Sequence, residues 1–410
     1  MRGAAKRNGA DNFKSHKFVT DTAREIAGRY GFSEMSPPIF ELASVFSRTM
    51  GETSDVVTKE MYTLSNRGGE EEMALRPEFT AGICRAFVSN ALYDQVPFKV
   101  FATGPLFRYE RPQKGRQRQF HQIDVELLGV SGPAADIEVL AIGQHILDEL
   151  DVTADVTLKL NTLGDLESRN AYREKLINYL KPFENELSEN SRKRLHRNPL
   201  RILDSKSERD QEIVAGAPLL KESLNHSSRK FFDSVCEGLT QLDIPFFFDP
   251  RLVRGLDYYT HTAFEFVTET LGAQGAVIAG GRYDGLIEQL GGRPTPGIGW
   301  AGGIERLAMM VGEERNRTRP IAIIPIGEAA EARAQLLARD LRKAGFAIEL
   351  DYSGTTKRRL NRANKAGVCA ALIIGDDELD KDVVTVRDMD TGEQQETGRV
   401  SLLESLAPYR

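Results

Sequence analysis

The residues best suited to chemistry in this sequence lie in one stretch, residues 254–266. It begins at Arg254, passes through Asp257, Tyr258 and Tyr259, and continues into an alternating pattern that predicts a strand. Burying a guanidinium and a carboxylate beside two phenols is costly unless each polar group finds a partner. The stretch therefore indicates a substrate pocket. Taken alone, it also fits a strand entry with solvated charges and two core tyrosines.

A second stretch, residues 104–122, concentrates positive charge between two predicted antiparallel strands. The strands are expected at 101–109 and 120–128, with a loop at 111–119. The positive side chains of the loop are Arg111, Lys114, Arg116 and Arg118. Because guanidinium groups bind phosphate through paired hydrogen bonds, we favour a phosphate site. A solvated hairpin tip is the alternative.

A third stretch combines glycines with a further arginine. It runs from Gly280 to Gly285 and resumes at residues 297–307, which include Arg306. The small residues at 297–299 would let a flat base approach the backbone.

Together and in this order, the three stretches resemble the bacterial histidyl-tRNA synthetases, a class II aminoacyl-tRNA synthetase family. Residues 254–266 are similar to the family's histidine signature, residues 104–122 to motif 2, and the third stretch to motif 3. Three long matches in order are far more specific than one short motif. The resemblance covers nearly the whole chain. It implies an α+β multidomain fold: an antiparallel class II sheet with flanking helices, a helical insertion and a C-terminal α/β anticodon-binding domain.

The activity implied by the resemblance is ligation of histidine to tRNA(His) through a histidyl-adenylate made from ATP. Arg108, Arg254 and Arg306 match catalytic arginines, which would act by electrostatic stabilisation and positioning. The residues that match the ATP site are Arg108, Glu110, Arg116 and Arg306. Mg²⁺ is expected to bridge the phosphates, and no metal ion held by protein ligands is expected.

The histidine pocket is likewise implied by the resemblance. The matching residues are Glu78, Phe79, Thr80, Arg108, Gln122, Glu126, Arg254, Tyr258, Tyr259 and Tyr283. A carboxylate such as Glu78 is the natural partner of the substrate ammonium, and carboxylates and phenols can pair with imidazole nitrogens. Phe79 stands where the family has glycine, so it could narrow the pocket or shift the turn. As alternatives, Glu78 is an ordinary helix N-terminal acid and the tyrosines are core residues.

The tRNA contacts are expected in two places. In the motif 2 loop, Arg118 and Gln119 lie beyond the arginines assigned to ATP. In the C-terminal domain, a basic helix at 357–365 carries Lys357, Arg358, Arg359, Arg362 and Lys365. A third basic run, residues 191–197, lies in the insertion and would suit phosphate contacts. Solvated helix faces are the alternative for the basic run.

The expected domains are 1–160 and 241–315 for the two parts of the catalytic core, 161–240 for the insertion and 320–410 for anticodon binding, after a polar linker at 312–320. Residues 13–30 have helical periodicity and end before Gly31. This helix and the proline-bearing extended segment 36–41 resemble motif 1, which implies a homodimer.

In the C-terminal domain, strands are expected at 321–326, 347–351 and 370–374 and helices at 330–344 and 357–365, forming a small sheet with parallel strands.

Composition agrees with a globular, cytoplasmic enzyme that has no membrane contact. A chain of 410 residues is longer than one hydrophobic core usually serves, which indicates more than one domain. Hydrophobic residues make up 40% and charged residues 28% of the chain, and the net charge is −6, which indicates neither disorder nor a membrane span. The three cysteines are far apart, without metal or disulfide spacing, and no signal peptide is expected. Residues 2–7 depart from the family's usual N-terminus, and the bases read in tRNA(His) do not follow from the sequence.

Two alternatives belong to other functional classes. One is a synthetase-like regulatory subunit of the first enzyme of histidine biosynthesis, which would bind histidine without charging tRNA. Phe79 favours it, whereas Arg254, Arg306, the motif 2 loop and the C-terminal domain favour charging. The other is a non-catalytic tRNA-binding protein, which leaves the pocket unexplained.

Overall fold

The chain forms two compact units, divided between residues 313 and 314, in a computed structural model. The structure describes residues 8–51, 54, 56–65, 71–111, 115–254, 256, 258–272, 275–311 and 319–409. The predicted linker at 312–320 and the divergent N-terminus at 2–7 fall largely or wholly outside these residues. No helix in the described ranges is both long and apolar enough to cross a membrane.

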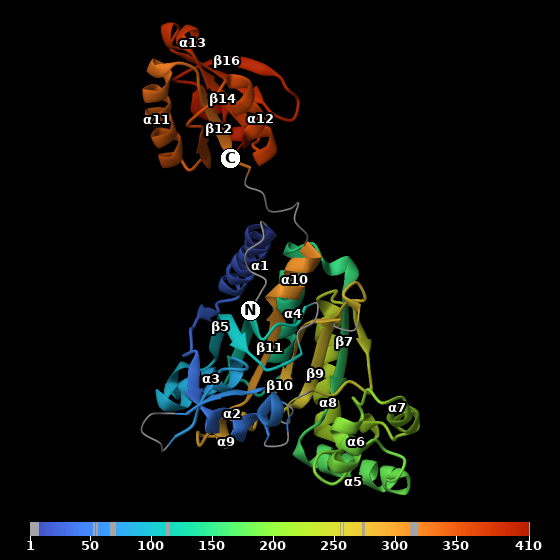
Figure 1. Cartoon of the computed structure of the whole chain (residues 1–410). Helices are drawn as coiled ribbons and strands as arrows, with labels where there is room; N and C mark the ends of the chain where they lie inside the picture. Colours follow the sequence, from blue (N-terminus) through green and yellow to red (C-terminus); the bar gives the residue numbers. More distant parts are fainter. Residues whose placement is uncertain are drawn as a thin grey trace. The chain divides into compact units, whose positions relative to one another are not determined.

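The first unit is built on an eight-stranded sheet (Figure 1). In spatial order its strands are β1 (Ser33–Glu34), β5 (Phe98–Phe107), β6 (Gln119–Leu128), β11 (Gly297–Gly303), β10 (Ala276–Arg282), β9 (Thr260–Val267), β7 (Thr157–Thr162) and β8 (Phe246–Phe248). The predicted antiparallel sheet with flanking helices is confirmed, although the outermost strands β1 and β8 pair in parallel with their neighbours. The motif 2 hairpin is confirmed as β5 and β6.

Helices cover one face of this sheet. They are α1 (Asn8–Arg29), α4 (Pro133–Glu149), α8 (His226–Gln241) and α10 (Ile304–Val311). From β6, the side chains of Ile123, Val125 and Leu127 pack into this core. Because strand side chains alternate, Gln122, Asp124 and Glu126 point to the opposite face. The helix predicted at 13–30 is confirmed as part of α1, and Gly31 follows it with a positive φ of 79°.

The proline-bearing segment after α1 is only partly a strand. Pro37 and Pro38 lie between β1 and β2 (Phe40–Leu42), and their carbonyls accept hydrogen bonds from Arg76 at 2.5 and 3.4 Å. Strand β2 joins β4 (Met73–Leu75) and β3 (Tyr62–Leu64) in a separate antiparallel sheet. Helices α2 (Ala43–Met50), α3 (Thr80–Ser89) and α9 (Leu286–Gln289) pack nearby.

The region 161–240 is mostly helical, as predicted. Its helices α5 (Leu166–Leu180), α6 (Glu189–Arg194) and α7 (Glu208–Ala215) gather at one end of the unit (Figure 1). The two ends of the region, however, serve the main sheet: Asn161 and Thr162 belong to β7, and Val235 and Leu239 of α8 lie in the sheet's core. The domain limits at 160 and 240 stay predictions.

The second unit contains a five-stranded sheet in the order β13 (Ile348–Leu350), β12 (Ile321–Pro325), β14 (Ala370–Ile374), β15 (Val383–Asp388) and β16 (Gln394–Gly398). The first three strands are parallel, which confirms that prediction. The antiparallel hairpin β15–β16 was not predicted. Helices α11 (Glu328–Lys343) and α12 (Thr356–Ala366) match the predicted helices, and α13 (Asp376–Asp380) and α14 (Leu402–Ser405) are additional.

Candidate functional site

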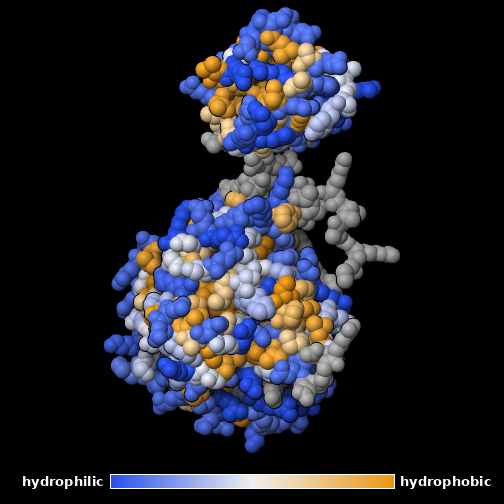
Figure 2. Space-filling model, turned by 90° about the vertical axis from the view of Figure 1, so that its left-hand side faces the viewer, coloured by the Kyte–Doolittle hydropathy of each residue, from blue (hydrophilic) through white to orange (hydrophobic). Residues whose placement is uncertain are grey.

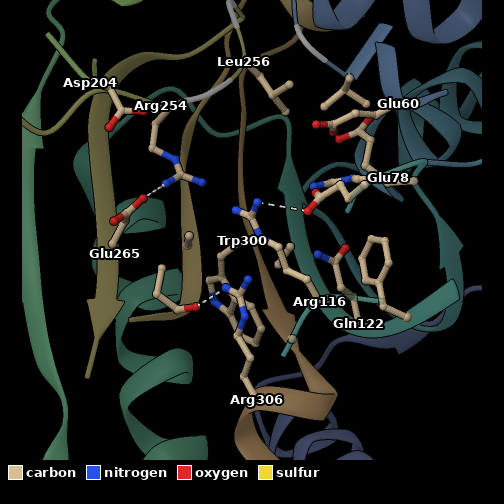
Figure 3. Close-up of a pocket in the computed structure, with 18 of the residues that line it drawn as sticks. Glu60, Glu78, Arg116, Gln122, Asp204, Arg254, Leu256, Glu265, Trp300 and Arg306 are labelled. Carbon is tan, nitrogen blue, oxygen red and sulfur yellow. Dashed lines mark hydrogen bonds and ion pairs between the residues drawn. The ribbon is translucent and has the colours of Figure 1, made fainter. Parts of the chain in front are cut away.

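A polar cavity of about 690 Å³ lies beside the sheet of the first unit (Figure 3). Its walls come from the β5–β6 hairpin, the start of α3, strands β9 to β11 and the helical region 188–207. The structure brings together ten of the residues predicted to bind substrates: Glu78, Thr80, Arg108, Glu110, Arg116, Gln122, Arg254, Tyr258, Tyr259 and Arg306.

Glu78 is the helix N-terminal acid weighed for it from the sequence, and it also lines the cavity. Its Oε1 accepts a hydrogen bond from the backbone N–H of Ala81 at 2.8 Å, which satisfies a donor in the first turn of α3. Its Oε2 accepts one from the hydroxyl of Tyr258 at 3.1 Å. Burial raises the pKa of Glu78 above its usual value, although these hydrogen bonds act to lower it. The carboxyl is thus held in place at the cavity wall.

Glu126 and Tyr283 lie immediately behind the cavity wall and are almost wholly buried. Glu126 accepts hydrogen bonds from the hydroxyls of Thr80, at 2.5 Å, and Tyr283. A Cβ at Gly299 would collide with the carboxylate of Glu126, so the small residue expected to admit a flat base makes room for this side chain. Burial raises the pKa of Glu126 from 4.5 to about 8.

Asp124 is a cavity residue that the sequence analysis missed. It lies between Gln122 and Glu126 on the same face of β6, is 1% exposed, and lines the cavity. Neither carboxylate oxygen of Asp124 nor the Oε1 of Gln122 has a hydrogen-bond partner within the described part of the chain. Burial, together with Glu126 and Glu78, raises the pKa of Asp124 well above its usual value. The period-two spacing of three polar residues was the signal for it.

Arg254 forms an ion pair with Glu265 of β9, a partner that was not predicted (Figure 3). Its guanidinium carbon lies 5.6 Å from the ring centre of Tyr259, and its Nε has no acceptor among the residues described. Glu265 also lines the cavity. The predicted neighbour Asp257, like Gly255, lies outside the described residues.

Three other arginines of the cavity are held by backbone carbonyls or by a carboxylate. Arg108 donates through Nε to the Pro77 carbonyl at 2.9 Å, and Arg306 donates through Nη1 to the Ala276 carbonyl at 2.5 Å. Arg116 pairs with Glu110 at 3.1 Å. Burial, with Arg116 nearby, lowers the pKa of Arg306. Lys114 of the same predicted cluster lies outside the described residues.

Phe79 is placed differently from its prediction. Its side chain is fully buried in a hydrophobic cluster with Ile83, Val100 and Leu106, and Arg76 lies 4.4 Å from its ring centre. It is not among the residues that line the cavity. Phe79 therefore does not narrow the pocket, because its ring packs into the core, whereas a shift of the turn stays a prediction.

The residues assigned to tRNA do not line the cavity. Arg118 and Gln119 are exposed at the tip of the β5–β6 hairpin, with the Arg118 guanidinium 4.1 Å from the ring centre of Tyr109. On α12, Lys357 and Arg358 are exposed.

Two other arginines of α12 have partners in their own unit. Arg362 is exposed and pairs with Asp351 at 2.5 Å. Arg359 is only 6% exposed, and it donates to the carbonyl of Pro325 at the end of β12 and to that of Gly354 just before α12. Its prediction as part of the nucleic-acid face is wrong.

One group of side chains in the described part of the chain has the composition of a metal site. His16 of α1, His121 of β6 and Glu305 of α10 place ligand atoms within 4.8 Å of one another. Glu305 accepts the backbone N–H of His121 at 3.0 Å and contacts its Nδ1 at 2.9 Å. These hydrogen bonds join β6 to α10.

Comparisons with known proteins identify the family of this chain. A sequence model described as histidyl-tRNA synthetase matches residues 10–307, and one described as anticodon binding domain matches residues 320–407. The histidine–tRNA ligase of Rhodospirillum rubrum is 54% identical over 400 residues, covering 97% of this chain and 96% of that protein. That of Gluconobacter oxydans is 52% identical, covering 98% and 96%.

Among solved structures, the apo histidyl-tRNA synthetase of S. aureus superposes with a TM-score of 0.77 at 31% identity, covering 98% of this chain and 96% of the other. The sequence relatives, which are more than half identical to this chain, and the solved structure, which matches its fold along nearly the whole length, indicate the same family. This chain belongs to the histidyl-tRNA synthetase family.

Proposed function

We propose that this chain is a histidine–tRNA ligase, which activates L-histidine with ATP and transfers it to tRNA(His). The main structural support is a cavity that places buried carboxyl groups, Glu78 and Asp124, beside the arginines Arg108, Arg254 and Arg306. Such a combination of carboxyl groups and arginines suits an amino acid and ATP, because the ammonium group binds anions and the phosphates bind cations. The family supplies the identity of the amino acid.

In adenylate formation the substrate carboxylate attacks the α-phosphate and pyrophosphate leaves. We assign Arg108 and Arg254 to the α-phosphate and Arg306, with Arg116, to the remaining phosphates. Their contacts with Pro77, Glu265, Ala276 and Glu110 support this assignment, because donors that are already oriented need little reorganisation as charge develops.

For histidine, we assign Glu78 to the ammonium and the network of Thr80, Glu126 and Tyr283 to the imidazole, with Tyr258 and Tyr259 closing the pocket. Two hydroxyl groups already orient the Glu126 carboxyl. An imidazole nitrogen adds a hydrogen bond to this buried network that an apolar side chain cannot supply, so apolar amino acids should be rejected strongly.

Magnesium is proposed to arrive bound to ATP. Glu110 and Glu265 line the cavity and offer the carboxylate oxygens that Mg²⁺ prefers, so the residues present fit such an ion. When bound, Mg²⁺ would neutralise phosphate charge. The chain's own contribution is to fix Arg116 and Arg254 through these same carboxylates.

For tRNA, we assign Arg118 and Gln119 to the acceptor end and Lys357, Arg358 and Arg362 to the anticodon arm. Exposure of all five side chains supports the assignment. Because Arg362 pairs with Asp351, binding through it would exchange one anionic partner for another.

We further propose that the enzyme is a cytoplasmic homodimer that pairs through motif 1. Large apolar side chains are exposed on or beside the elements of motif 1: Phe13 is 68%, Ile39 is 44% and Phe40 is 59% exposed. Figure 2 shows apolar areas on the side of the first unit that carries α1 and α3. Contact with a second copy would remove such side chains from water.

The test is ATP–pyrophosphate exchange with each of the twenty amino acids in turn. We expect exchange with histidine alone. Exchange that depends on another amino acid would overturn the specificity, and no exchange with any of them would remove the ligase assignment.

The regulatory-subunit alternative has weaker support. A solved structure from Bacillus halodurans, titled ATP phosphoribosyltransferase regulatory subunit/histidyl-tRNA synthetase, is 22% identical with a TM-score of 0.63, which shows the fold alone. Phe79, which favoured this alternative, packs in the core and leaves the cavity unobstructed.

A further inference from the structure

Two imidazoles and one carboxylate meet beside the sheet of the first unit, and none of them has a role in the assignments above. They belong to His16 of α1, His121 near the start of β6 and Glu305 in the first turn of α10. Helices α1 and α10 lie side by side (Figure 1). The chain therefore brings together three residues that no short motif connects, since His121 and Glu305 alone are 184 positions apart.

The spacing of the cluster suits one small ion. One ligand atom from each residue lies within 4.8 Å of the other two. Zinc ligands lie ~2.0–2.2 Å from the ion, so the ligand atoms of a tetrahedral site are roughly 3.4 Å apart. The Oε1 of Glu305 is already 2.9 Å from the Nδ1 of His121, and the ring centres of His16 and His121 are 6.1 Å apart. A small turn of the His16 side chain would complete the site.

The donor set and its surroundings select the class of ion. Two imidazole nitrogens with one carboxylate oxygen form a known zinc ligand set, whereas Mg²⁺ prefers oxygen ligands and water. Among the described residues, Glu305 forms an ion pair with His121 alone, so no lysine or arginine there competes for its carboxylate.

The cluster is also open to solvent. All three residues are partly exposed, with the side chain of His121 at 37% and that of Glu305 at 11%. An ion can therefore enter, and a water molecule can serve as the fourth ligand of a site with three protein ligands.

We propose that His16, His121 and Glu305 bind one divalent transition-metal ion of the zinc type. Glu305 already joins α10 to β6 through its hydrogen bonds with His121, and the ion would add α1 to this junction through His16. The metal would take the place of the proton between the Nδ1 of His121 and the Oε1 of Glu305. This inference goes beyond the proposed function and does not rest on it.

The test is a titration of the full-length, metal-free protein with Zn²⁺ in competition with a chromogenic zinc chelator. ATP and histidine are left out, so the result does not depend on the ligase assignment. We expect one tightly bound Zn²⁺ per chain and a higher melting temperature when it is bound, because a ligand that binds only the folded state stabilises it. An excess of Mg²⁺ should not displace the zinc.

The first variant is His16→Ala. Loss of a group that only supports a metal ligand costs ~10–100-fold in affinity, so loss of a ligand should raise the Kd of Zn²⁺ at least about a hundredfold. The variant should also lose the rise in melting temperature that zinc causes. Without zinc it should melt near the wild type, because His16 is already partly exposed.

Two further variants make the test decisive. Glu305→Gln should weaken zinc binding as strongly as His16→Ala, although an amide oxygen can still accept the backbone N–H of His121. His226→Ala removes an exposed histidine at the start of α8, outside the cluster, and should leave the Kd of Zn²⁺ unchanged.

Three results would overturn the proposal. The first is a wild-type protein that binds no Zn²⁺ more tightly than His16→Ala does. The second is binding that is lost in Glu305→Gln but kept in His16→Ala, which would leave α1 outside the site. The third is equal weakening by His226→Ala, which would mean that zinc binds surface histidines without selection.

Discussion

Arg254 and Glu265 form an ion pair at the cavity wall, and this pairing fixes a guanidinium where the α-phosphate is proposed to bind. Replacing Arg254 with alanine should reduce histidine-dependent pyrophosphate exchange by roughly 10²–10³-fold, as for loss of one preorganised donor. The melting temperature should stay near that of the wild type, since Glu265 is partly exposed and can be solvated. Exchange at a near-normal rate would show that the ion pair is structural.

Arg254→Lys separates charge from geometry. Lysine keeps the charge but cannot bond Glu265 and a phosphate through one planar group, so exchange should remain low. Substantial rescue by lysine would mean that charge alone is required.

Glu126 makes the stability of the unliganded protein depend on pH. Its pKa is about 8 in the folded protein and 4.5 ordinarily, so between these values the folded state holds a proton that the unfolded state has lost. This stabilisation is complete below 4.5 and decreases as pH rises toward about 8, by at most about 1.4 kcal/mol per pH unit. Urea unfolding should show a smaller loss of stability over this range for Glu126→Gln than for wild type. An equal or larger loss in the variant would contradict the assignment.

At single residues, the sequence was informative where charge stood in an apolar setting. Arg254 was singled out for that reason, whereas Arg108 and Glu78 were predicted from the family resemblance, and all three line the cavity. Glu265 was missed because its partner is eleven residues away, and such pairing depends on the strand entry of β9. Arg359 was misplaced because a buried arginine that donates to strand-end carbonyls has the same sequence context as a surface arginine.

At the level of elements, we propose that arginines of the β5–β6 hairpin bind two different substrates. Arg116 faces the cavity, whereas Arg118 is exposed beyond it. Arg118→Ala should therefore lower the rate of tRNA charging more than the rate of pyrophosphate exchange, and Arg48→Ala, an exposed arginine on α2, should lower neither. Equal losses in both assays for Arg118→Ala would place this side chain at ATP.

Elements with strong local signals were predicted well. Helix α1 has clear periodicity and a glycine at its end, and the β5–β6 hairpin has long strands on both sides of its loop. The β15–β16 hairpin was missed although Thr391 and Gly392 mark its turn, because β16 is largely exposed and lacks an apolar alternation. Membership of Asn161 and Thr162 in β7 depends on pairing with β9, which no local pattern reveals.

At the scale of the whole molecule, the first unit contains every cavity residue and has its own hydrophobic cores. A chain that ends at residue 311 should therefore keep histidine-dependent exchange and lose most tRNA charging. Circular dichroism would confirm that it folds. Loss of exchange in a folded, truncated chain would show that the second unit supports adenylate chemistry.

Incorporation of labelled histidine into total tRNA measures the proposed charging reaction itself. We predict ATP-dependent incorporation into an alkali-labile ester, abolished by Arg254→Ala and unaffected by Arg48→Ala. Tight binding of histidine without incorporation, by a protein that also fails in pyrophosphate exchange, would contradict the claim and favour a histidine sensor.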